Sequence, residues 1–259
     1  MELRRRAAAV SLELRGAFHP EPHELDFGLP PSLTAGTIVL FGFTGGAQWH
    51  VFAGSIEACD GLPHPLDRWS RHVLGPLARE FDALDFYPNG TPQLPFQRLA
   101  ARCEPVHPSP IGLLIHPQWG LWHSYRGALL LNERIGLPAM TSSAHPCQSC
   151  ASKPCLSACP VGAFRSGAFD LDACVNHVRS AAGSDCREQG CRARRACPVG
   201  VEFSYREDQA RFHMTAYLRS VERDHPAILP AAVSPAPASD GAERGLRGSG
   251  EVGASGRRR

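Results

Sequence analysis

The chain has 259 residues, which is enough for one large domain or for one domain with a smaller module. Its hydrophobic content of 43% and charged content of 20% are typical of globular proteins, and no apolar stretch approaches the about 20 residues of a membrane-spanning helix. The formal net charge of +2 argues against nucleic acid, because a nucleic-acid-binding domain normally carries a clear basic excess. We therefore expect neither nucleic acid nor a membrane as a partner.

The first residues combine positive charge with a short apolar run. Arginines at positions 4–6 precede Ala-Ala-Ala-Val at residues 7–10, but Glu13 and Arg15 then interrupt the apolar run. A secretory signal needs a longer apolar core. We interpret this segment as a short surface helix and expect the protein in the cytoplasm.

Two elements are predicted next along the chain. Residues 36–43, Gly-Thr-Ile-Val-Leu-Phe-Gly-Phe, read as a buried strand that ends in a turn at residues 44–46. Residues 67–84 read as a helix, with Asp67 as its N-cap and apolar residues at helical spacing. Pro76 predicts a kink or a break in that helix.

Two further strands are predicted at residues 111–115 and 121–131, separated by His-Pro-Gln-Trp-Gly at residues 116–120. The alternation of strands and helices is typical of mixed α/β and α+β folds. We expect residues 1–143 to form an α+β domain.

The C-terminal part contains one more predicted helix. Ser204 and Glu207 fit a capping box at the start of a helix within residues 204–230, which we expect to pack on the main domain. Residues 231–259 are rich in Pro, Ala, Ser, Gly and Arg. Such a segment buries too little apolar surface to offset its ordering entropy, so we expect it to be disordered.

The ten cysteines are unevenly distributed. Eight of them lie between positions 147 and 197, and only Cys59 and Cys103 lie outside this segment. Clustered cysteines in a cytoplasmic protein indicate metal rather than disulfides. We therefore expect a metal-binding module at residues 144–203, and we expect Cys59 and Cys103 to pack in apolar surroundings.

The first cysteine run is Cys147-x2-Cys150-x4-Cys155-x3-Cys159-Pro160. It is similar to the bacterial ferredoxin run C-x2-C-x2-C-x3-C-P, which has a shorter middle spacing. In that run three cysteines bind one [4Fe–4S] cluster, and the fourth, which precedes the proline, binds a second cluster.

The second run ends in an echo of the first, because Cys-Pro-Val-Gly occurs at residues 159–162 and again at residues 197–200. The echo predicts that the cysteine before each proline crosses over to the other cluster. The predicted ligands of one cluster are Cys147, Cys150, Cys155 and Cys197. Those of the other cluster are Cys159, Cys174, Cys186 and Cys191.

Two alternatives to a pair of clusters remain open. One is a single cluster plus another group, because the second run is irregularly spaced and Cys174 is its least secure ligand. The other is zinc or disulfides. Zinc sites favour two close Cys/His pairs, whereas this segment has one C-x2-C, and His145 or His177 would have to complete the site.

Four arginines crowd the second run, at positions 187, 192, 194 and 195. They are either an ordinary solvated surface or a docking face for an acidic electron donor such as a flavodoxin or a reductase.

The layout of the cysteine segment resembles the two-cluster part of epoxyqueuosine reductase, a cobalamin-dependent family, and that of 2[4Fe–4S] ferredoxins. A lone cysteine, Cys174, follows the first Cys-Pro at the family distance, and Gly190-Cys191 precedes the final Cys-Pro. The family has another cysteine between these last two, where this chain has Arg194. The resemblance implies that Cys186 replaces it.

The flanking segments resemble the cblC-type vitamin B12-processing chaperone. The resemblance is found in Gly-Leu-Leu-Ile-His-Pro at residues 112–117, Gly-Leu-Trp at 120–122, Arg-Gly at 126–127, and Tyr-Arg-Glu-Asp-Gln-Ala-Arg-Phe at 205–212. Both families are similar in fold to flavin nitroreductases. The resemblance implies an antiparallel sheet with flanking helices that carries a ferredoxin-like two-cluster module.

The cobalamin resemblance implies cofactor-binding roles for Gly112, His116, Gly120 and Arg126. From the residues alone, His116 is equally a core or surface histidine, the glycines are common in turns, and Arg126 is equally a partner in an ion pair. The Asp-x-His-x-x-Gly signature of cobalt-ligating histidines is absent.

We therefore predict a protein whose two clusters pass single electrons to a bound corrinoid, or to a flavin. Whether it is itself an enzyme, such as a cobalamin-processing or cobalamin-dependent reductase, is left open. The rival hypothesis is a ferredoxin-like electron carrier without an active site. A structural, DNA-associated cluster protein is disfavoured by the near-neutral charge.

Overall fold

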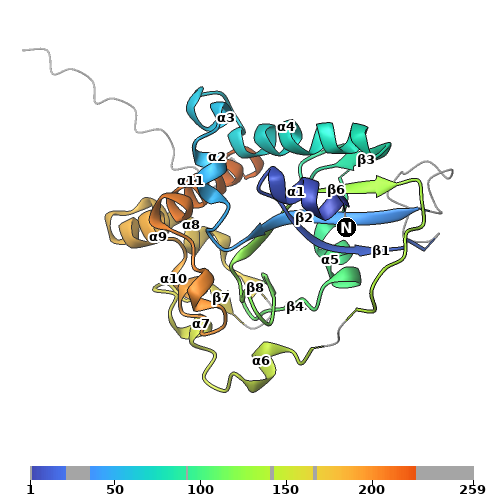
Figure 1. The fold of residues 1–259 in the computed structure, drawn as a ribbon. Coiled ribbons are helices and arrows are strands. Elements are labelled where there is room, and N and C mark those ends of the chain that lie inside the picture. The colour runs from blue at the N-terminus through green and yellow to red at the C-terminus, as the bar shows by residue number, and fades with distance from the viewer. Residues whose placement is uncertain (1, 22–35, 92, 141–142, 166–167, 226–259) are drawn as a thin grey trace, which may run out of the picture.

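The computed structural model describes residues 2–21, 36–91, 93–140, 143–165 and 168–225. At its centre lies a four-stranded sheet of order β1-β2-β6-β3, in which every neighbouring pair is antiparallel (Figure 1). The strands are β1 (Glu13–Phe18), β2 (Thr37–Thr44), β6 (His123–Leu131) and β3 (Ala83–Phe86). The fold is therefore a mixture of helices with an antiparallel sheet, as predicted, while the likeness to nitroreductases stays a prediction.

The predicted strand at residues 36–43 is β2, which is buried along almost its whole length. Its apolar run is continuous because both faces of the sheet are covered. Successive side chains point to opposite faces. Val39, Phe41 and Phe43 enter one core cluster, whereas Ile38 and Leu40 enter another.

Helices cover the two faces of the sheet. On one face lie α1 (Glu2–Ala9), α2 (Trp49–Ala53) and α4 (Pro65–Glu80), and on the other lies α5 (Phe96–Cys103). The short helix α3 (Ile56–Cys59) connects α2 and α4. The predicted N-terminal helix is thus present as α1, and its Ala7 is buried in the core.

Helix α4 differs from the prediction at both ends. It begins at Pro65, because proline fits the first helical position, and Asp67 lies within the first turn instead of capping it. It ends at Glu80, so Leu84 belongs to β3. The helix also continues through Pro76, where a kink or a break was expected.

The two strands predicted at residues 111–131 are shorter than expected. Only β5 (Leu114–Ile115) and β6 are strands, and β5 pairs with β4 (His107–Pro108). Between β5 and β6, His116 and Gly120 exchange two backbone hydrogen bonds of 2.8 and 2.9 Å. We call residues 116–120 the Trp119 turn.

The cysteine segment is built from short elements. They are α6 (Pro146–Ser149), α7 (Pro154–Ser157), β7 (Phe164–Arg165), β8 (Ala168–Phe169), α8 (Leu171–Arg179), η3 (Ala181–Gly183), α9 (Ser184–Gln189), α10 (Arg192–Arg195) and η4 (Val201–Phe203). In Figure 1 they gather on one side of the central sheet.

Helix α11 (Glu207–Asp224) follows the cysteine segment and joins it to the main domain. Its Phe212 packs against the rings of Trp49 and Phe52 at 5.1 and 5.3 Å, and the helix also runs along α9. The predicted capping box is wrong, because the Ser204 hydroxyl donates to the Val201 carbonyl of the preceding turn.

The domain boundaries stay predictions, and residues 231–259, expected to be disordered, lie outside the described residues. Among the helices that are described, none combines the length and the apolar character needed to cross a membrane.

A buried ion pair fastens the sheet to its surroundings. Arg15 of β1 donates to Glu104 at 2.8 Å, and both side chains are almost fully buried. Arg15 also donates to the Phe43 carbonyl at 3.0 Å, and its guanidinium lies 4.5 Å from the ring centre of Trp119. The Tyr125 hydroxyl donates to Glu104 as well. One arginine thus joins β1, β2 and the Trp119 turn.

We expect Arg15→Met to lower the free energy of unfolding by about 3–5 kcal/mol, because Glu104 would be left buried without its partner. Urea unfolding followed by circular dichroism would measure it. The matched control is Arg5→Met, which breaks an exposed pair with Glu2 and should leave the midpoint unchanged. A loss below about 1 kcal/mol for Arg15→Met would contradict this account.

Candidate functional site

The eight cysteines of the segment form two groups of four, and the first group joins three neighbours in sequence with one distant thiol. Burial raises the pKa of Cys147, and the charges of three further thiols raise it more. Those thiols belong to Cys197, Cys155 and Cys150. The exposed Lys153 acts in the opposite direction on Cys147. We call these four cysteines the first thiol group.

The second thiol group consists of Cys159, Cys174, Cys186 and Cys191, which line one cavity together. Burial raises the pKa of Cys174 to about 11, against the hydrogen bond that the Tyr217 hydroxyl donates to its sulfur at 3.8 Å. The charges of the other three thiols raise that pKa further. Cys174, the least secure ligand in the sequence, thus lies among the other three.

Proximity alone assigns no ligand to a cluster, so the predicted division of the cysteines, with the crossover of Cys159 and Cys197, stays a prediction. That these thiols bind metal stays a prediction. Among the described residues, no three His, Cys, Asp or Glu side chains converge on a single metal ion. The four thiolates of a cubane cluster bind four different iron atoms, so they need not meet at one point.

Both copies of Cys-Pro-Val-Gly end in a glycine with a left-handed backbone. Gly162 and Gly200 have φ values of +57° and +69°, a left-handed conformation that glycine adopts without strain. In the first turn the Gly162 amide donates to the Cys159 carbonyl at 3.1 Å, and the Ala163 amide donates to the Cys159 sulfur at 3.3 Å.

Apolar side chains surround the first thiol group. Ile115 and Leu121 from the main domain and Ala193 from α10 are buried against Cys155 and Cys197. This shell covers Cys155 and Cys197, whereas Cys147 and Cys150 are partly exposed. Control of solvent access and of the local dielectric constant are two ways in which a protein tunes a metal centre.

The main domain and the second Cys-Pro-Val-Gly turn meet backbone to backbone. A Cβ atom built on Gly120 would overlap the Val199 carbonyl oxygen, and one on Gly200 would overlap the backbone of Trp119 and Gly120. Gly120 therefore permits close approach of the chain's own backbone. Gly112, by contrast, has φ of +78° and open space at its Cβ position.

His116 is a satisfied, buried histidine. Its ring stacks on Trp119 with centroids 3.9 Å apart, and its Nδ1 accepts the backbone N–H groups of Gln118 and Trp119 at 3.1 and 3.3 Å. Burial and the charge of Arg15 lower its pKa to about 4, so the ring is neutral at pH 7. Its role in the structure is to shape the Trp119 turn.

Arg126 lies apart from His116, at an irregularity of the β2–β6 pairing where Phe41 pairs with Gly127 and Gly42 with Tyr125. Burial lowers its pKa, and its buried Nε has no hydrogen-bond partner. That Gly112, His116, Gly120 and Arg126 bind a cofactor stays a prediction.

Other buried polar atoms of β6, of α11 and of Trp122, the residue before β6, have no hydrogen-bond partner either. They are Trp122 Nε1, Ser124 Oγ, His213 Nε2 and both side-chain polar atoms of Gln209. The Tyr205 ring lies 5.3 Å from Trp122 and 5.2 Å from His213, and the charges of Arg126 and Arg194 help burial to lower the pKa of His213 to about 3. We call Trp122, Arg126, Gln209 and His213 the β6–α11 polar cluster.

The sequence analysis missed Gln209 and His213 as site residues. Their spacing of one helical turn, with Gln209 fully buried on a helix face that also holds Ala210, is the signal that could have identified them.

The four arginines of the second run have different surroundings. Arg187 donates to the Val178 and Ser180 carbonyls, while Arg192 and Arg195 both bind Asp185. Arg194 points inward, where it donates to the Leu121 carbonyl at 2.6 Å.

The Arg194 guanidinium also lies between two aromatic rings, those of Trp122 and Tyr205. It is 4.7 Å from the ring centre of Trp122 and 4.3 Å from that of Tyr205. Such cation–π contacts stabilise a buried arginine that has no carboxylate partner. Arg194 thus connects α10, which carries cluster-candidate cysteines at its two ends, to the polar cluster.

The two outlying cysteines behave differently from each other. Cys59 is exposed at the end of α3, so the expectation of core packing is wrong for it. Cys103 is partly buried, and a Cβ on Gly16 would overlap it.

No protein-family model and no curated protein matches this chain. Among solved structures, it is similar to epoxyqueuosine reductase from Streptococcus thermophilus, with 14% identity and a TM-score of 0.45 over 86% of this chain and 74% of that one. A selenomethionine-labelled epoxyqueuosine reductase has 15% identity and a TM-score of 0.42 over 81% and 67%. A third structure, epoxyqueuosine reductase with an epoxyqueuosine-modified tRNA-Tyr stem loop, has 15% identity and a TM-score of 0.41 over 79% and 66%.

The exclusion of nucleic acid is corrected by this comparison, because one similar structure contains a tRNA stem loop. The physical reason is that net charge sums over a whole chain and hides local excess. Residues 184–195 contain four arginines and two acidic residues, so this short segment alone has the formal charge of +2 that the whole chain has.

All three of these solved structures are epoxyqueuosine reductases, the family that the cysteine layout also resembles. The resemblances to ferredoxins and to the cblC-type chaperone stay predictions.

We expect Cys197→Ser to lose the cluster of the first thiol group and Cys159→Ser to lose the cluster of the second. Each variant should keep about half of the wild-type iron. Iron analysis and electron paramagnetic resonance of the surviving cluster would measure this. Cys59→Ala and Cys103→Ala are the controls and should keep all of the iron. Loss of the same cluster in both serine variants would contradict the crossover.

We expect Gly120→Ala to lose iron from the first thiol group, because its methyl group would displace the turn that follows Cys197. The matched control is Gly112→Ala, which has a similar positive φ but no neighbour within 4 Å. Backbone strain is therefore common to both variants, and only Gly120→Ala adds an overlap. Equal iron content in the two variants would contradict this account.

Proposed function

We propose that the protein carries two [4Fe–4S] clusters and transfers single electrons. The observation that supports this most directly is the sorting of eight thiols into two groups of four without remainder. All-thiolate sets of four are typical cubane ligands, and a bound cubane takes up and releases one electron at a time.

The residues around the thiols have defined tasks in this proposal. Tyr217 and the Ala163 amide donate hydrogen bonds to Cys174 and Cys159, and such bonds to ligand sulfur raise the reduction potential of a cluster. Ile115 and Leu121 shield Cys155 and Cys197 from water. All ten cysteines are free thiols, which fits our placement of the protein in the cytoplasm.

We further propose that the β6–α11 polar cluster binds the electron acceptor, a corrinoid. Unpaired buried donors and acceptors are costly, and a ligand that pairs with them recovers that free energy. Arg126 Nε and Trp122 Nε1 can donate, and the Gln209 amide can both donate and accept. A corrin ring carries amide side chains around its edge, so it matches this mixture of donors and acceptors.

The residues of this chain would bind and orient the corrinoid without ligating its cobalt. His116 already uses its Nδ1 within the Trp119 turn, and burial keeps His213 neutral near two arginines. Arg194 would hold α10 against Trp122, which fixes the separation between the clusters and the ligand. A one-electron donor suits cobalt, whose oxidation states differ by single electrons.

Anaerobically prepared protein should contain about eight iron and about eight sulfide per chain, because each cubane has four of each. Colorimetric iron and labile-sulfide assays would measure this. About four iron would mean that one thiol group holds no cluster. Stoichiometric zinc without sulfide would end the proposal.

Addition of base-off cobalamin should shift the corrinoid absorption spectrum, and Arg126→Met should weaken the binding about tenfold because a charged hydrogen bond is lost. Spectral titration gives both affinities, and Arg134→Met, at an exposed position, is the control. Iron content should be unchanged in both variants. If the wild-type protein binds no form of cobalamin, the corrinoid proposal is wrong and the electron-carrier function stands. If it binds flavin instead, the corrinoid proposal is also wrong.

A further inference from the structure

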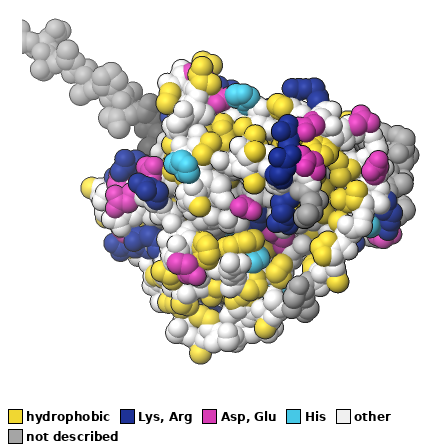
Figure 2. Space-filling model, viewed as in Figure 1, with side chains coloured by type: hydrophobic (Ala, Val, Ile, Leu, Met, Phe, Trp, Pro, Cys, Tyr) yellow, Lys and Arg dark blue, Asp and Glu magenta, His cyan; other side chains and the backbone are white. Residues whose placement is uncertain are grey.

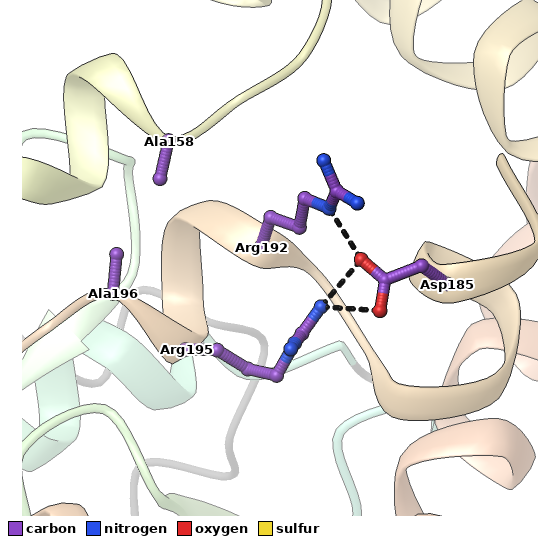
Figure 3. A pocket seen from close by; sticks show the side chains of 5 residues that line it. All are labelled: Ala158, Asp185, Arg192, Arg195 and Ala196. Atoms are coloured by element: carbon purple, nitrogen blue, oxygen red, sulfur yellow. Dashed lines mark hydrogen bonds and ion pairs between the residues drawn. The ribbon is translucent and has the colours of Figure 1, made fainter. Parts of the chain in front are cut away.

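An open depression lies on the surface of the cysteine segment, between α7, α9 and α10. It has a volume of about 460 Å³ and is lined by Ala158, Asp185, Arg192, Arg195 and Ala196. Figure 3 shows two arginine side chains from α10 converging on the carboxylate of Asp185, with Ala158 and Ala196 at the other side. None of these five residues belongs to the thiol groups or to the β6–α11 polar cluster.

The depression borders both thiol groups. Ala158 immediately precedes Cys159 of the second group, and Ala196 immediately precedes Cys197 of the first. Arg192 lines the depression on one side and the cavity of the second thiol group on the other. An electron that enters here therefore starts beside the two cysteines that cross between the groups.

The lining carries a net positive charge. Arg192 and Arg195 share the single carboxylate of Asp185, and Arg195 binds it through two contacts of 2.7 and 2.8 Å. One positive charge remains, on side chains that are 48% and 33% exposed.

Ion pairs between arginine and carboxylate side chains also occur on α8, α9 and α11. Arg211 pairs with Glu188 and Arg179 pairs with Glu222, and the face drawn in Figure 2 shows basic and acidic groups intermixed. The methyl side chains of Ala158 and Ala196 leave room for a partner to approach the backbone beside the cysteines.

We propose that this depression is the docking site of an acidic one-electron carrier protein, whose carboxylates bind Arg192 and Arg195. The inference rests on the proposed clusters. The carrier loses one electron and a cluster gains it, so no bond forms or breaks and no proton moves. Opposite charge raises the rate of encounter and orients the carrier toward the crossing cysteines.

An acidic protein fits this site better than RNA. RNA binding relies on many phosphate contacts, whereas the depression offers two arginines that are already bound to a carboxylate. A carrier protein needs only a small complementary patch, because its complex must also dissociate after each electron.

The test uses the full chain loaded with iron and sulfide, and reduced flavodoxin as the acidic carrier. Stopped-flow absorbance would follow cluster reduction by flavodoxin and, separately, by dithionite. We expect Arg195→Glu to lower the ratio of the flavodoxin rate to the dithionite rate about tenfold at low salt. Arg195→Lys should retain most of the wild-type ratio, and the wild-type flavodoxin rate should fall as salt increases.

The control is Arg5→Glu, a charge reversal on α1 that should leave the ratio at its wild-type value. Three results would overturn docking at this site. The first is that Arg195→Glu leaves the ratio of the flavodoxin rate to the dithionite rate unchanged. The second is that Arg5→Glu lowers this ratio as much as Arg195→Glu does. The third is that a tRNA stem loop binds the wild type and binds Arg195→Glu more weakly, while the rate ratio stays constant.

The assays distinguish a failure of the docking site from a failure of the proposed clusters. Wild-type protein without about eight iron would contradict the clusters themselves. A fully loaded wild type whose reduction by flavodoxin ignores both salt and Arg195 would leave the clusters in place and contradict the docking site alone. If Arg195→Glu fails to load iron, the salt dependence of the wild type and the Arg195→Lys variant decide the matter.

Discussion

The backbone contact between Gly120 and the Val199–Gly200 turn is the constraint on which the function of this molecule depends. It brings the Trp119 turn of the main domain against the segment that follows Cys197, with no side chain between them. Arg15 supports the same turn from the sheet through its contact with Trp119. The position of the first thiol group is therefore set by the central sheet, because rigid elements place a site more accurately than loops do.

Two adjacent arginines of α10 point in opposite directions. Arg194 is directed inward, between Trp122 and Tyr205, whereas Arg195 is directed outward to Asp185. One short helix between Cys191 and Cys197 thus contacts the polar cluster on one side and the surface depression on the other. In the proposed function, this helix lies along the route from the electron donor to the acceptor.

The sequence predicted the features that local pattern controls. The apolar run of β2, the amphipathic character of α11 and the repeated Cys-Pro-Val-Gly are all visible within short windows. The division of the eight cysteines, which was argued from that repeat, stays a prediction. The sequence could not predict that the Gly120 backbone meets Val199, or that the Tyr205 ring contacts both Trp122 and His213. These are contacts between distant segments, which depend on how elements pack. Cys59 illustrates the same limit, since its apolar neighbours in sequence lie at an exposed helix end.

Lys153 has a practical consequence. It is the one lysine in the sequence, it is exposed, and it stands in a left-handed conformation with φ of +39° immediately before the helix that carries Cys155. A reagent directed at thiols would label the exposed Cys59 and any cysteine that binds no metal, so it would not mark one chosen position. An amine-directed fluorophore would instead attach its side-chain label beside the first thiol group, where quenching by a nearby cluster would report on assembly and loss of that cluster in real time.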